Sequence, residues 1–186
     1  LSSLKIAYNG AEPIRAETLK RFSEAFAGCG FKEEAFFPCY GLAETTLLVS
    51  GGPPLAVKRV ATVDGMTSQR DDSVNGYGKR NFVSCGQIGP DLEVRIVNAE
   101  TAVECGPDEV GEIWVHGASV AKGYWHRLDE TAAAFQARLN DDDREWLRTG
   151  DLGFLQDDEL YVTGRLKDVI IIRGQNLYPQ DIEQIV

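Results

Sequence analysis

Apolar positions in the first forty residues follow two different spacings. Residues 4–8 form a short apolar run that predicts a strand, and residues 36–39 predict a second extended segment. Between them, residues 14–26 place apolar side chains at helical spacing, which predicts a helix that Gly28 and Gly30 end. A strand, a helix and a strand in this order are typical of a βαβ unit in a parallel sheet. The apolar stripe of the helix consists of Ile14, Leu19, Phe22 and Phe26.

Later in the chain the spacing becomes that of antiparallel strands. Residues 92–96 alternate between apolar and charged side chains, as a half-buried strand does, and residues 111–117 predict the next strand. A hairpin is predicted over residues 152–162. Together these segments predict a small, distorted antiparallel β-barrel. One helix interrupts them, over residues 129–139, with Asp129 as its N-cap.

The predicted hairpin has a polar turn at residues 157–159. If these three residues form the loop, Gln156 lies opposite Leu160, and the same register sets Asp151 opposite Arg165. The apolar positions of its two strands are Leu152, Phe154, Leu160 and Val162.

The pairing of Asp151 with Arg165 has two interpretations. It can be a cross-strand ion pair, which at a surface contributes little to stability. Alternatively, the carboxylate can accept two hydrogen bonds from a vicinal diol while the guanidinium donates to oxygens nearby. Spacing alone favours the ion pair.

Beyond the hairpin, residues 168–173 form a β-branched run that predicts a buried strand, which Gly174 ends. A helix is predicted to start at Tyr178 and Pro179, since proline is favoured in the first turn of a helix.

Composition excludes some classes of partner. The formal net charge is −10 and the pI is about 4.7, which argue against nucleic-acid and anionic-membrane surfaces. No segment has the length of a transmembrane helix, so no stable membrane insertion is expected. The 4 cysteines include no C-x-x-C pair, which indicates reduced thiols in a cytoplasmic protein. The chain begins at Leu1 and stops at Val186, barely two turns into a predicted helix, so we expect it to be a piece of a longer protein.

Three strings near the end carry a family resemblance: TGD at 149–151, GRLKDVIIIRG at 164–174 and NLYPQDIE at 176–183. They resemble the late motifs of the adenylate-forming superfamily, and their wording is similar to that of its fatty acyl-AMP ligase branch. The resemblance implies that Asp151 binds the ribose hydroxyls of ATP and that Arg165 lies at the ribose and phosphate. It also implies that Lys167 is the hinge about which a small C-terminal domain swings.

Two loops that follow predicted strands extend the resemblance. The first holds Asn9, Gly10, Ala11 and Glu12, and the second runs from Tyr40 to Thr46. A Gly-Ala pair after a strand lets a flat ring approach the backbone, although by itself it would be an ordinary turn. The resemblance implies that the first loop lines the adenine.

In the second loop, the resemblance implies that Tyr40 stacks on the adenine and that Gly41, Leu42 and Ala43 complete the nucleotide site. Glu44 is the catalytic candidate and would hold Mg²⁺, a cation that takes one or two carboxylates together with nucleotide oxygens. Ala43 stands where most of the superfamily carries threonine, and alanine is usual in the fatty acyl-AMP ligase branch.

The long irregular segment that follows the breaker at residues 50–54 has no counterpart in acyl-CoA synthetases, according to the resemblance. The alternative is a passive surface loop. The predicted fold class is α/β plus β, and it is that of an adenylate-forming enzyme. Its parts are the end of an α/β nucleotide-binding subdomain at 1–52, an insertion at 53–82, a β-barrel-like subdomain at 83–166, and the hinge and start of a small α+β C-terminal domain at 167–186.

The resemblance implies an enzyme that uses ATP and Mg²⁺ to convert a fatty acid to acyl-adenylate and then passes the acyl group to an acyl carrier protein in lipid or polyketide biosynthesis. An acyl-CoA synthetase, or a non-catalytic module that binds nucleotide or carrier protein, is the alternative. The chain contains no glycine-rich phosphate loop, and the family's catalytic lysine would lie downstream. Residues 1–186 alone are therefore expected to be inactive.

Overall fold

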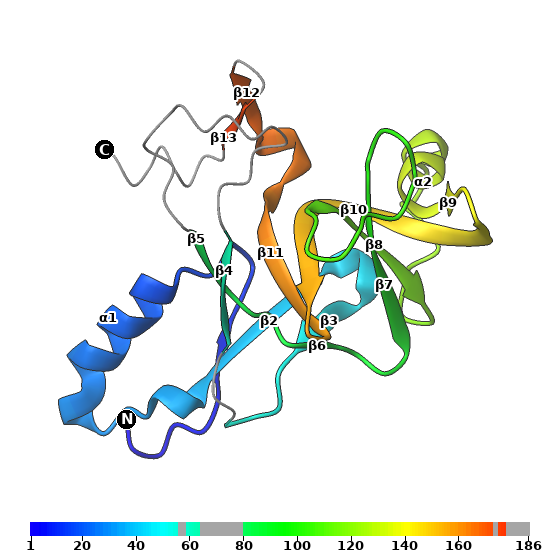
Figure 1. Cartoon of the computed structure of the whole chain (residues 1–186). Helices are drawn as coiled ribbons and strands as arrows, with labels where there is room; N and C mark the ends of the chain where they lie inside the picture. Colours follow the sequence, from blue (N-terminus) through cyan, green and yellow to red (C-terminus); the bar gives the residue numbers. More distant parts are fainter. Residues whose placement is uncertain (56–58, 64–79, 173–174, 178–186) are drawn as a thin grey trace.

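The computed structural model describes residues 1–55, 59–63, 80–172 and 175–177. Its first unit is β1 (Ala7–Asn9), α1 (Ala16–Phe26) and β2 (Phe36–Leu42), and β1 pairs with β2 in parallel (Figure 1). The predicted βαβ unit is therefore confirmed. After a 3₁₀ turn at Ala27–Cys29, Gly30 adopts the left-handed conformation with φ 79°, as predicted for the residue that ends this helical segment.

The helix α1 covers the parallel strands through one buried side chain. Leu19 is buried and packs in a cluster with Phe31, Phe36 and Val83. Phe22, also predicted for the stripe, is 39% exposed and has an edge-to-face contact with Phe36 at 5.6 Å between ring centroids. Of the predicted stripe only Leu19 is buried, since Phe22 and Phe26 are exposed and Ile14 precedes the helix.

The remaining strands join this unit in one continuous sheet of order β1-β2-β3-β6-β11-β10-β8-β7, with β9 paired to β10. Every pair except β1–β2 is antiparallel. The predicted combination of α/β and antiparallel β structure is confirmed, while the strand order over the described residues is an open path and not a closed barrel. The added strands are β3 (Leu47–Gly51), β6 (Gln87–Ile88), β7 (Leu92–Val97), β8 (Gly111–Gly117), β9 (Ala137–Leu139), β10 (Asp142–Gln156) and β11 (Glu159–Arg165).

The hairpin of β10 and β11 corrects one prediction and confirms another. Its turn has two residues, Asp157 and Asp158, at φ 51° and 62°, so that Gln156 pairs with Glu159. The predicted three-residue loop was wrong, because two consecutive positive-φ residues form the tighter turn that suits strand twist. Asp151 nevertheless pairs with Arg165, since a bulge next to Leu152 shifts the register by one residue.

The second helix is shorter than predicted. The helix α2 spans Leu128–Phe135, and Arg127, not Asp129, occupies its N-cap without a side-chain capping hydrogen bond. The rest of the predicted helix is β9, which pairs with β10. Leu139 on β9 is buried with Trp146, so packing against the sheet decides the conformation of this segment over its local helical propensity.

The ends of the predicted insertion form two strands that dock on the hairpin. The strands β4 (Val60–Val63) and β5 (Arg80–Val83) pair with each other, and the residues between them lie outside the described part of the chain. Ala61 and Phe82 pack against Phe154 and Tyr161, whose rings stack at 4.8 Å. Docking therefore uses Ala61 and Phe82, whereas Val60 next to Ala61 is 48% exposed.

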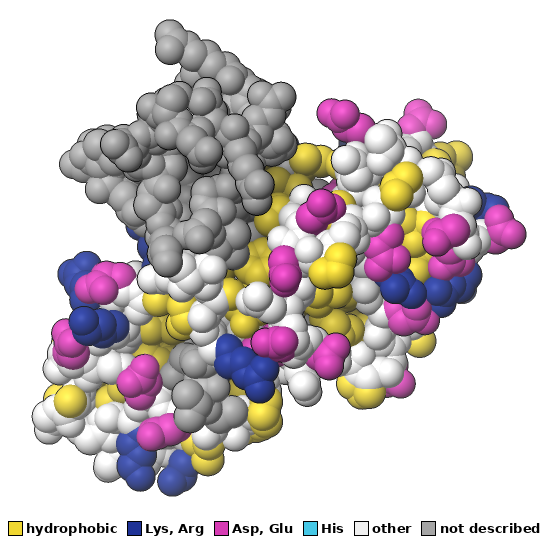
Figure 2. All heavy atoms as spheres, viewed as in Figure 1, with side chains coloured by type: hydrophobic (Ala, Val, Ile, Leu, Met, Phe, Trp, Pro, Cys, Tyr) yellow, Lys and Arg dark blue, Asp and Glu magenta, His cyan; other side chains and the backbone are white. Residues whose placement is uncertain are grey.

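At the end of the described chain, a 3₁₀ turn at Leu166–Asp168 leads to β12 (Ile170–Ile172), which pairs with β13 (Gln175–Leu177). The strand predicted over 168–173 is thus present in shorter form, but its first residue, Ile170, is 43% exposed and not buried as predicted. Gly174 and the helix predicted from Tyr178 lie outside the described residues. Among the helices described, none combines the length and the apolar character needed to cross a membrane. Acidic and basic side chains are interspersed over the face shown in Figure 2.

Candidate functional site

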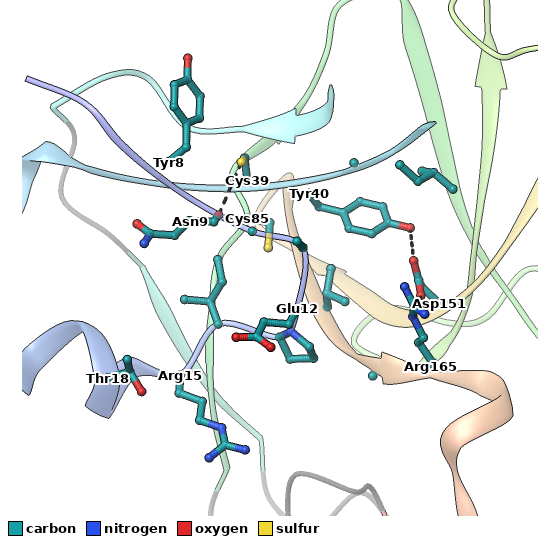
Figure 3. Close-up of a pocket in the computed structure, with 18 of the residues that line it drawn as sticks. Tyr8, Asn9, Glu12, Arg15, Thr18, Cys39, Tyr40, Cys85, Asp151 and Arg165 are labelled. Carbon is teal, nitrogen blue, oxygen red and sulfur yellow. Dashed lines mark hydrogen bonds and ion pairs between the residues drawn. The ribbon is translucent and has the colours of Figure 1, made fainter. Parts of the chain in front are cut away.

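A pocket of about 760 Å³ lies where the parallel unit meets the mouth of the hairpin (Figure 3). Three segments far apart in sequence supply most of its lining: the loop after β1, the end of β2, and the paired ends of β10 and β11; the start of α1 and Cys85 complete it. Nine of the predicted nucleotide-site residues lie in this lining, namely Asn9, Gly10, Ala11, Glu12, Tyr40, Gly41, Leu42, Asp151 and Arg165. The fold therefore brings the two predicted loops and the predicted cross-strand pair to one cavity.

Asp151 is the centre of the polar groups in this pocket. Its Oδ2 accepts a hydrogen bond from the Tyr40 hydroxyl at 2.8 Å, and its Oδ1 lies 3.3 Å from Nε of Arg165 (Figure 3). The Asp151 side chain is 15% exposed, whereas that of Arg165 is 57% exposed. The predicted ion pair is therefore present, and it lies at the pocket with its carboxylate largely buried and its guanidinium side chain largely exposed.

Burial governs the ionisation of this group. Desolvation raises the pKa of Asp151, and the hydrogen bond from Tyr40 and the charge of Arg165 partly oppose that shift. Desolvation and the nearby Asp151 charge also raise the pKa of Tyr40, so its hydroxyl remains a donor at neutral pH. The Asp151 carboxylate is thus bound by the Tyr40 phenol and the Arg165 guanidinium. Its remaining lone pairs can accept hydrogen bonds from a ligand.

The loop after β1 lies against the backbone of β2. A Cβ at Gly10 would lie 2.9 Å from the Cys39 carbonyl oxygen, so glycine permits this close approach. Ala11 follows in the left-handed region, with φ 69°. Asn9 Oδ1 is buried and has no hydrogen-bond partner among the described residues. These features give the pocket a wall made mostly of backbone, with one amide oxygen beside it.

Glu44 lies just outside the pocket lining, on the 3₁₀ turn Ala43–Thr45 that follows β2. Its Oε1 accepts a 2.7 Å hydrogen bond from the Tyr124 hydroxyl, and this bond is the main cause that raises the pKa of Tyr124 to about 12. Thr131 supports Tyr124 by accepting its backbone N–H at 2.9 Å. Tyr124 was missed from the sequence, because the two residues are 80 positions apart and meet only through loop conformation.

Glu44 is a reasonable ligand for a hard cation. Within the described ranges no group of three or more His, Cys, Asp or Glu side chains could hold a metal ion by itself. A magnesium ion bound with a nucleotide needs only one or two carboxylates, because phosphate and water oxygens complete its coordination. The charge of Glu44 also contributes, in a minor way, to the raised pKa of Asp151, so the two carboxylates share one electrostatic environment.

The other two predicted residues flank the pocket without lining it. Ala43 is exposed, and its carbonyl accepts the Thr46 N–H at 3.1 Å, which closes the 3₁₀ turn. Lys167 is exposed on the 3₁₀ turn that leads away from Arg165. No structural feature described for Lys167 tests its predicted role as a hinge, which stays a prediction.

The cysteines lie as unpaired thiols. All 4 are free, and burial raises the pKa of Cys85 to about 12 and also raises the pKa of Cys39. Cys39 and Cys85 line the pocket as neutral thiols, which fits the expected reduced state. They make the pocket wall apolar where they lie.

Comparison with known proteins adds family information. Residues 1–125 match the family model described as AMP-binding enzyme. The medium-chain-fatty-acid–[acyl-carrier-protein] ligase JamA of Moorena producens is 49% identical over 100% of this chain and 33% of its own length. The long-chain-fatty-acid–AMP ligase FadD32 of Mycolicibacterium smegmatis is 42% identical, over 98% of this chain and 31% of its own length.

Solved structures are also similar over nearly the whole chain. One of them is the fatty acyl-adenylate ligase from L. pneumophila in complex with acyl adenylate and pyrophosphate, with a TM-score of 0.82 and 51% identity over 99% of this chain and 33% of that chain. The present chain thus spans about a third of the length of the relatives that it matches.

Proposed function

Because this chain belongs to the AMP-binding enzyme family, we propose that the protein carrying it converts a fatty acid and ATP to acyl-adenylate and pyrophosphate. One observation carries the proposal: Asp151 lines the pocket, hydrogen-bonded to Tyr40 and paired with Arg165, and the loop of residues 9–12 lines the same pocket. A diol acceptor that shares a pocket with a glycine-containing backbone loop suits a nucleoside. The fatty acid is inferred from the names of the relatives JamA and FadD32.

The proposed reaction is an in-line displacement at phosphorus. A carboxylate oxygen of the fatty acid attacks the α-phosphorus of ATP, and the bond from that phosphorus to the bridging oxygen of pyrophosphate breaks. Asp151 accepts hydrogen bonds from the ribose hydroxyls, the Tyr40 ring lies beside the base, and Arg165 reaches toward the phosphate. Glu44 would hold Mg²⁺, which offsets charge on the phosphate oxygens when it is bound.

In the second half-reaction, we propose that the thiol of a carrier protein's phosphopantetheine arm attacks the acyl carbonyl and releases AMP. We infer the carrier protein from the name of the relative JamA, and we propose a place in lipid or polyketide biosynthesis in the cytoplasm. An acyl-CoA synthetase would instead use the thiol of CoA in the same step.

The test uses the protein at its natural length. Fatty-acid-dependent exchange of labelled pyrophosphate into ATP is expected, and no exchange with fatty acids of any chain length would overturn the proposal in favour of a non-catalytic module. Offering CoA and an acyl carrier protein separately then identifies the acceptor. Acylated carrier protein without acyl-CoA is the expected result, and acyl-CoA as the main product would overturn the assigned acceptor.

We propose further that the insertion at 53–82 restricts the use of CoA. Its support is that Ala61 and Phe82, at its two ends, pack on Phe154 and Tyr161 of the hairpin that carries Asp151. Replacing residues 55–80 with a short Gly-Ser linker should keep adenylation and allow some acyl-CoA to form, since loop length changes closure entropy slowly. A variant that replaces only residues 64–79 keeps the docked strands and serves as the control. A folded, adenylating 55–80 variant that forms no acyl-CoA would refute this role.

A further inference from the structure

The segment that carries Asp151 leaves the regular pairing of β10 with β8. Arg148 pairs with Trp114 and Leu152 pairs with Glu112, so three residues of β10 lie opposite the single residue Ile113 of β8. Within this three-residue bulge, Gly150 has φ 71°, a conformation that favours glycine. Bulges commonly redirect a side chain at a functional site, and this one directs Asp151 toward Tyr40.

Side chains replace the ladder hydrogen bonds that the bulge loses. The backbone N–H of Gly150 donates to Oε1 of Glu112 at 3.1 Å, and the N–H of Asp151 donates to Thr149 Oγ1 at 3.1 Å. Thr149 Oγ1 donates in turn to the Ile113 carbonyl at 2.7 Å. The conformation of the bulge is therefore set by two side chains, one from β8 and one from the bulge itself.

Glu112 is itself buried and fixed by several hydrogen bonds. It is 2% exposed, and its Oε2 accepts Nε and Nη2 of Arg148 at 3.0 and 2.8 Å and Nε1 of Trp114 at 2.9 Å. Arg148 also lies over the Trp114 ring, 5.5 Å from its centroid. These donors bind one carboxylate oxygen and the Gly150 N–H binds the other, so both oxygens accept hydrogen bonds. Together the bonds fix the position of the Glu112 side chain.

A carboxylate at this position is not needed for packing. Glu112 lies in the strand segment of residues 111–115, which is otherwise apolar and buried, and burying a charge in such a place is costly unless it is fully paired. A buried ion pair is often no more stabilising than apolar side chains of similar volume. An apolar residue here would leave the Gly150 N–H without its acceptor.

We propose that Glu112, held by Arg148, is a positioning residue that fixes the 149–151 bulge in the conformation that presents Asp151 to the ribose hydroxyls of the nucleotide. Glu112 acts through Asp151 and does not itself contact the ligand. This inference rests on the proposed function, since it assumes that Asp151 binds ribose.

The variant Glu112→Gln tests it with little change in volume. An amide has one acceptor and one donor group, so in either orientation its NH₂ faces an N–H of Gly150 or the donors of Arg148 and Trp114. The matched control is Glu93→Gln, because Glu93 also pairs with an arginine, Arg144, at 2.7 and 3.1 Å, but on an exposed surface. A second variant, Thr149→Val, removes the hydroxyl that accepts the Asp151 N–H and keeps the branched shape.

The measurement is the ratio of kcat/KM for ATP to that for 2′-deoxy-ATP, in fatty-acid-dependent pyrophosphate exchange by the natural-length protein. The natural protein should favour ATP by roughly tenfold, the range of a charge-assisted hydrogen bond, and Asp151→Asn should abolish the preference. Glu112→Gln and Thr149→Val should each lower the ratio by at least about fivefold, and Glu93→Gln should leave it unchanged. The double variant Glu112→Gln, Asp151→Asn should show the same ratio as Asp151→Asn alone, because both changes remove one interaction.

The outcomes separate the two proposals. A folded Glu112→Gln protein with the natural ratio would overturn the positioning role, and a merely structural role would lower thermal stability without changing the ratio. If Glu112→Gln does not fold, an unchanged ratio in Thr149→Val overturns it instead. Exchange activity without any preference for the 2′-hydroxyl would overturn the inference and keep the adenylating function, whereas no exchange at all would refute the proposed function itself.

Discussion

Asp151 and Glu44, the two carboxylates to which we assign roles in the proposed reaction, are held in opposite ways. Asp151 is 15% exposed, stands on a bulge fixed by buried side chains, and contacts both a phenol and a guanidinium. Glu44 lies on a 3₁₀ turn, where a half-exposed phenol, that of Tyr124, donates to its Oε1. A carboxylate that must recognise a fixed diol benefits from being preorganised, whereas one that must coordinate a cation arriving with the nucleotide benefits from partners that can move.

The largest effect is expected from Glu44→Gln in the natural-length protein. If Glu44 stabilises charge during phosphoryl displacement, kcat for adenylation should fall by about 10²–10³, the range for loss of one preorganised electrostatic group. Steady-state pyrophosphate release at saturating ATP measures this. Glu104→Gln is the control, since Glu104 pairs with Arg95 on the surface, at 3.2 Å. A kcat within threefold of the natural value would remove Glu44 from the reaction step.

Asp151→Ala should act on binding more than on kcat. It removes charge-assisted hydrogen bonds worth roughly 1.5–3 kcal/mol each, so the apparent affinity for ATP should fall by at least about tenfold. Titration calorimetry with ATP measures the affinity, and circular dichroism should show unchanged helix content. Unaltered ATP binding in the folded variant would return Asp151 to a purely structural ion pair with Arg165.

Tyr40→Phe should change the pH dependence of ATP binding. The hydrogen bond from Tyr40 is the largest of the effects that lower the pKa of Asp151, against the desolvation that raises it above its ordinary 3.8. Because the ionised carboxylate is the acceptor, ATP affinity is lost as the pH falls through this pKa. Without the phenol the pKa rises further, so the acid limb of kcat/KM for ATP should move to higher pH. An unmoved limb would contradict the coupling of the two groups.

The smallest effect is expected from Tyr124→Phe. Loss of the hydrogen bond to Glu44 Oε1 should leave the carboxylate less well oriented and raise the half-saturating Mg²⁺ concentration about twofold, the effect of a modest hydrogen bond. A Mg²⁺ titration of initial rates at fixed ATP measures it, with Glu104→Gln as the control because Glu104 pairs with Arg95 on the surface, away from the pocket. If Tyr124→Phe raised the half-saturating Mg²⁺ concentration as much as Glu44→Gln does in the same titration, Glu44 would be held as rigidly as Asp151.

The contacts of the site that follow strand periodicity could be predicted from the sequence, and the other contacts could not. The pairing of Asp151 with Arg165 follows from hairpin register, yet it was obtained through two compensating features: a turn one residue shorter than expected, and a bulge that adds one residue near Leu152. Both features depend on backbone twist and on packing of the neighbouring strands, which a period-2 pattern does not encode.

Contacts between loops and within buried polar networks were missed. The bond from Tyr124 to Glu44 depends on where two loops end in space. Glu112 carried a recognisable signal, because a carboxylate inside a buried apolar strand requires specific partners, but the sequence could not identify Arg148 and the Gly150 N–H as those partners. The segment of Ala137–Leu139 was predicted as helix because its propensity is local, whereas its burial against the sheet is not.

The hydrogen bond between Tyr40 and Asp151 joins residues that are 111 positions apart, and this separation has a consequence for synthesis of the protein. While the chain leaves the ribosome, the βαβ unit can form from its own local contacts, but the pocket cannot exist until the hairpin has been made and paired. Contacts of this range form late, since their loop-closure entropy must be overcome first. A nucleotide that binds at Asp151 therefore stabilises only the completed sheet, and ATP in the cell would act on this protein as a ligand that selects molecules that have finished folding.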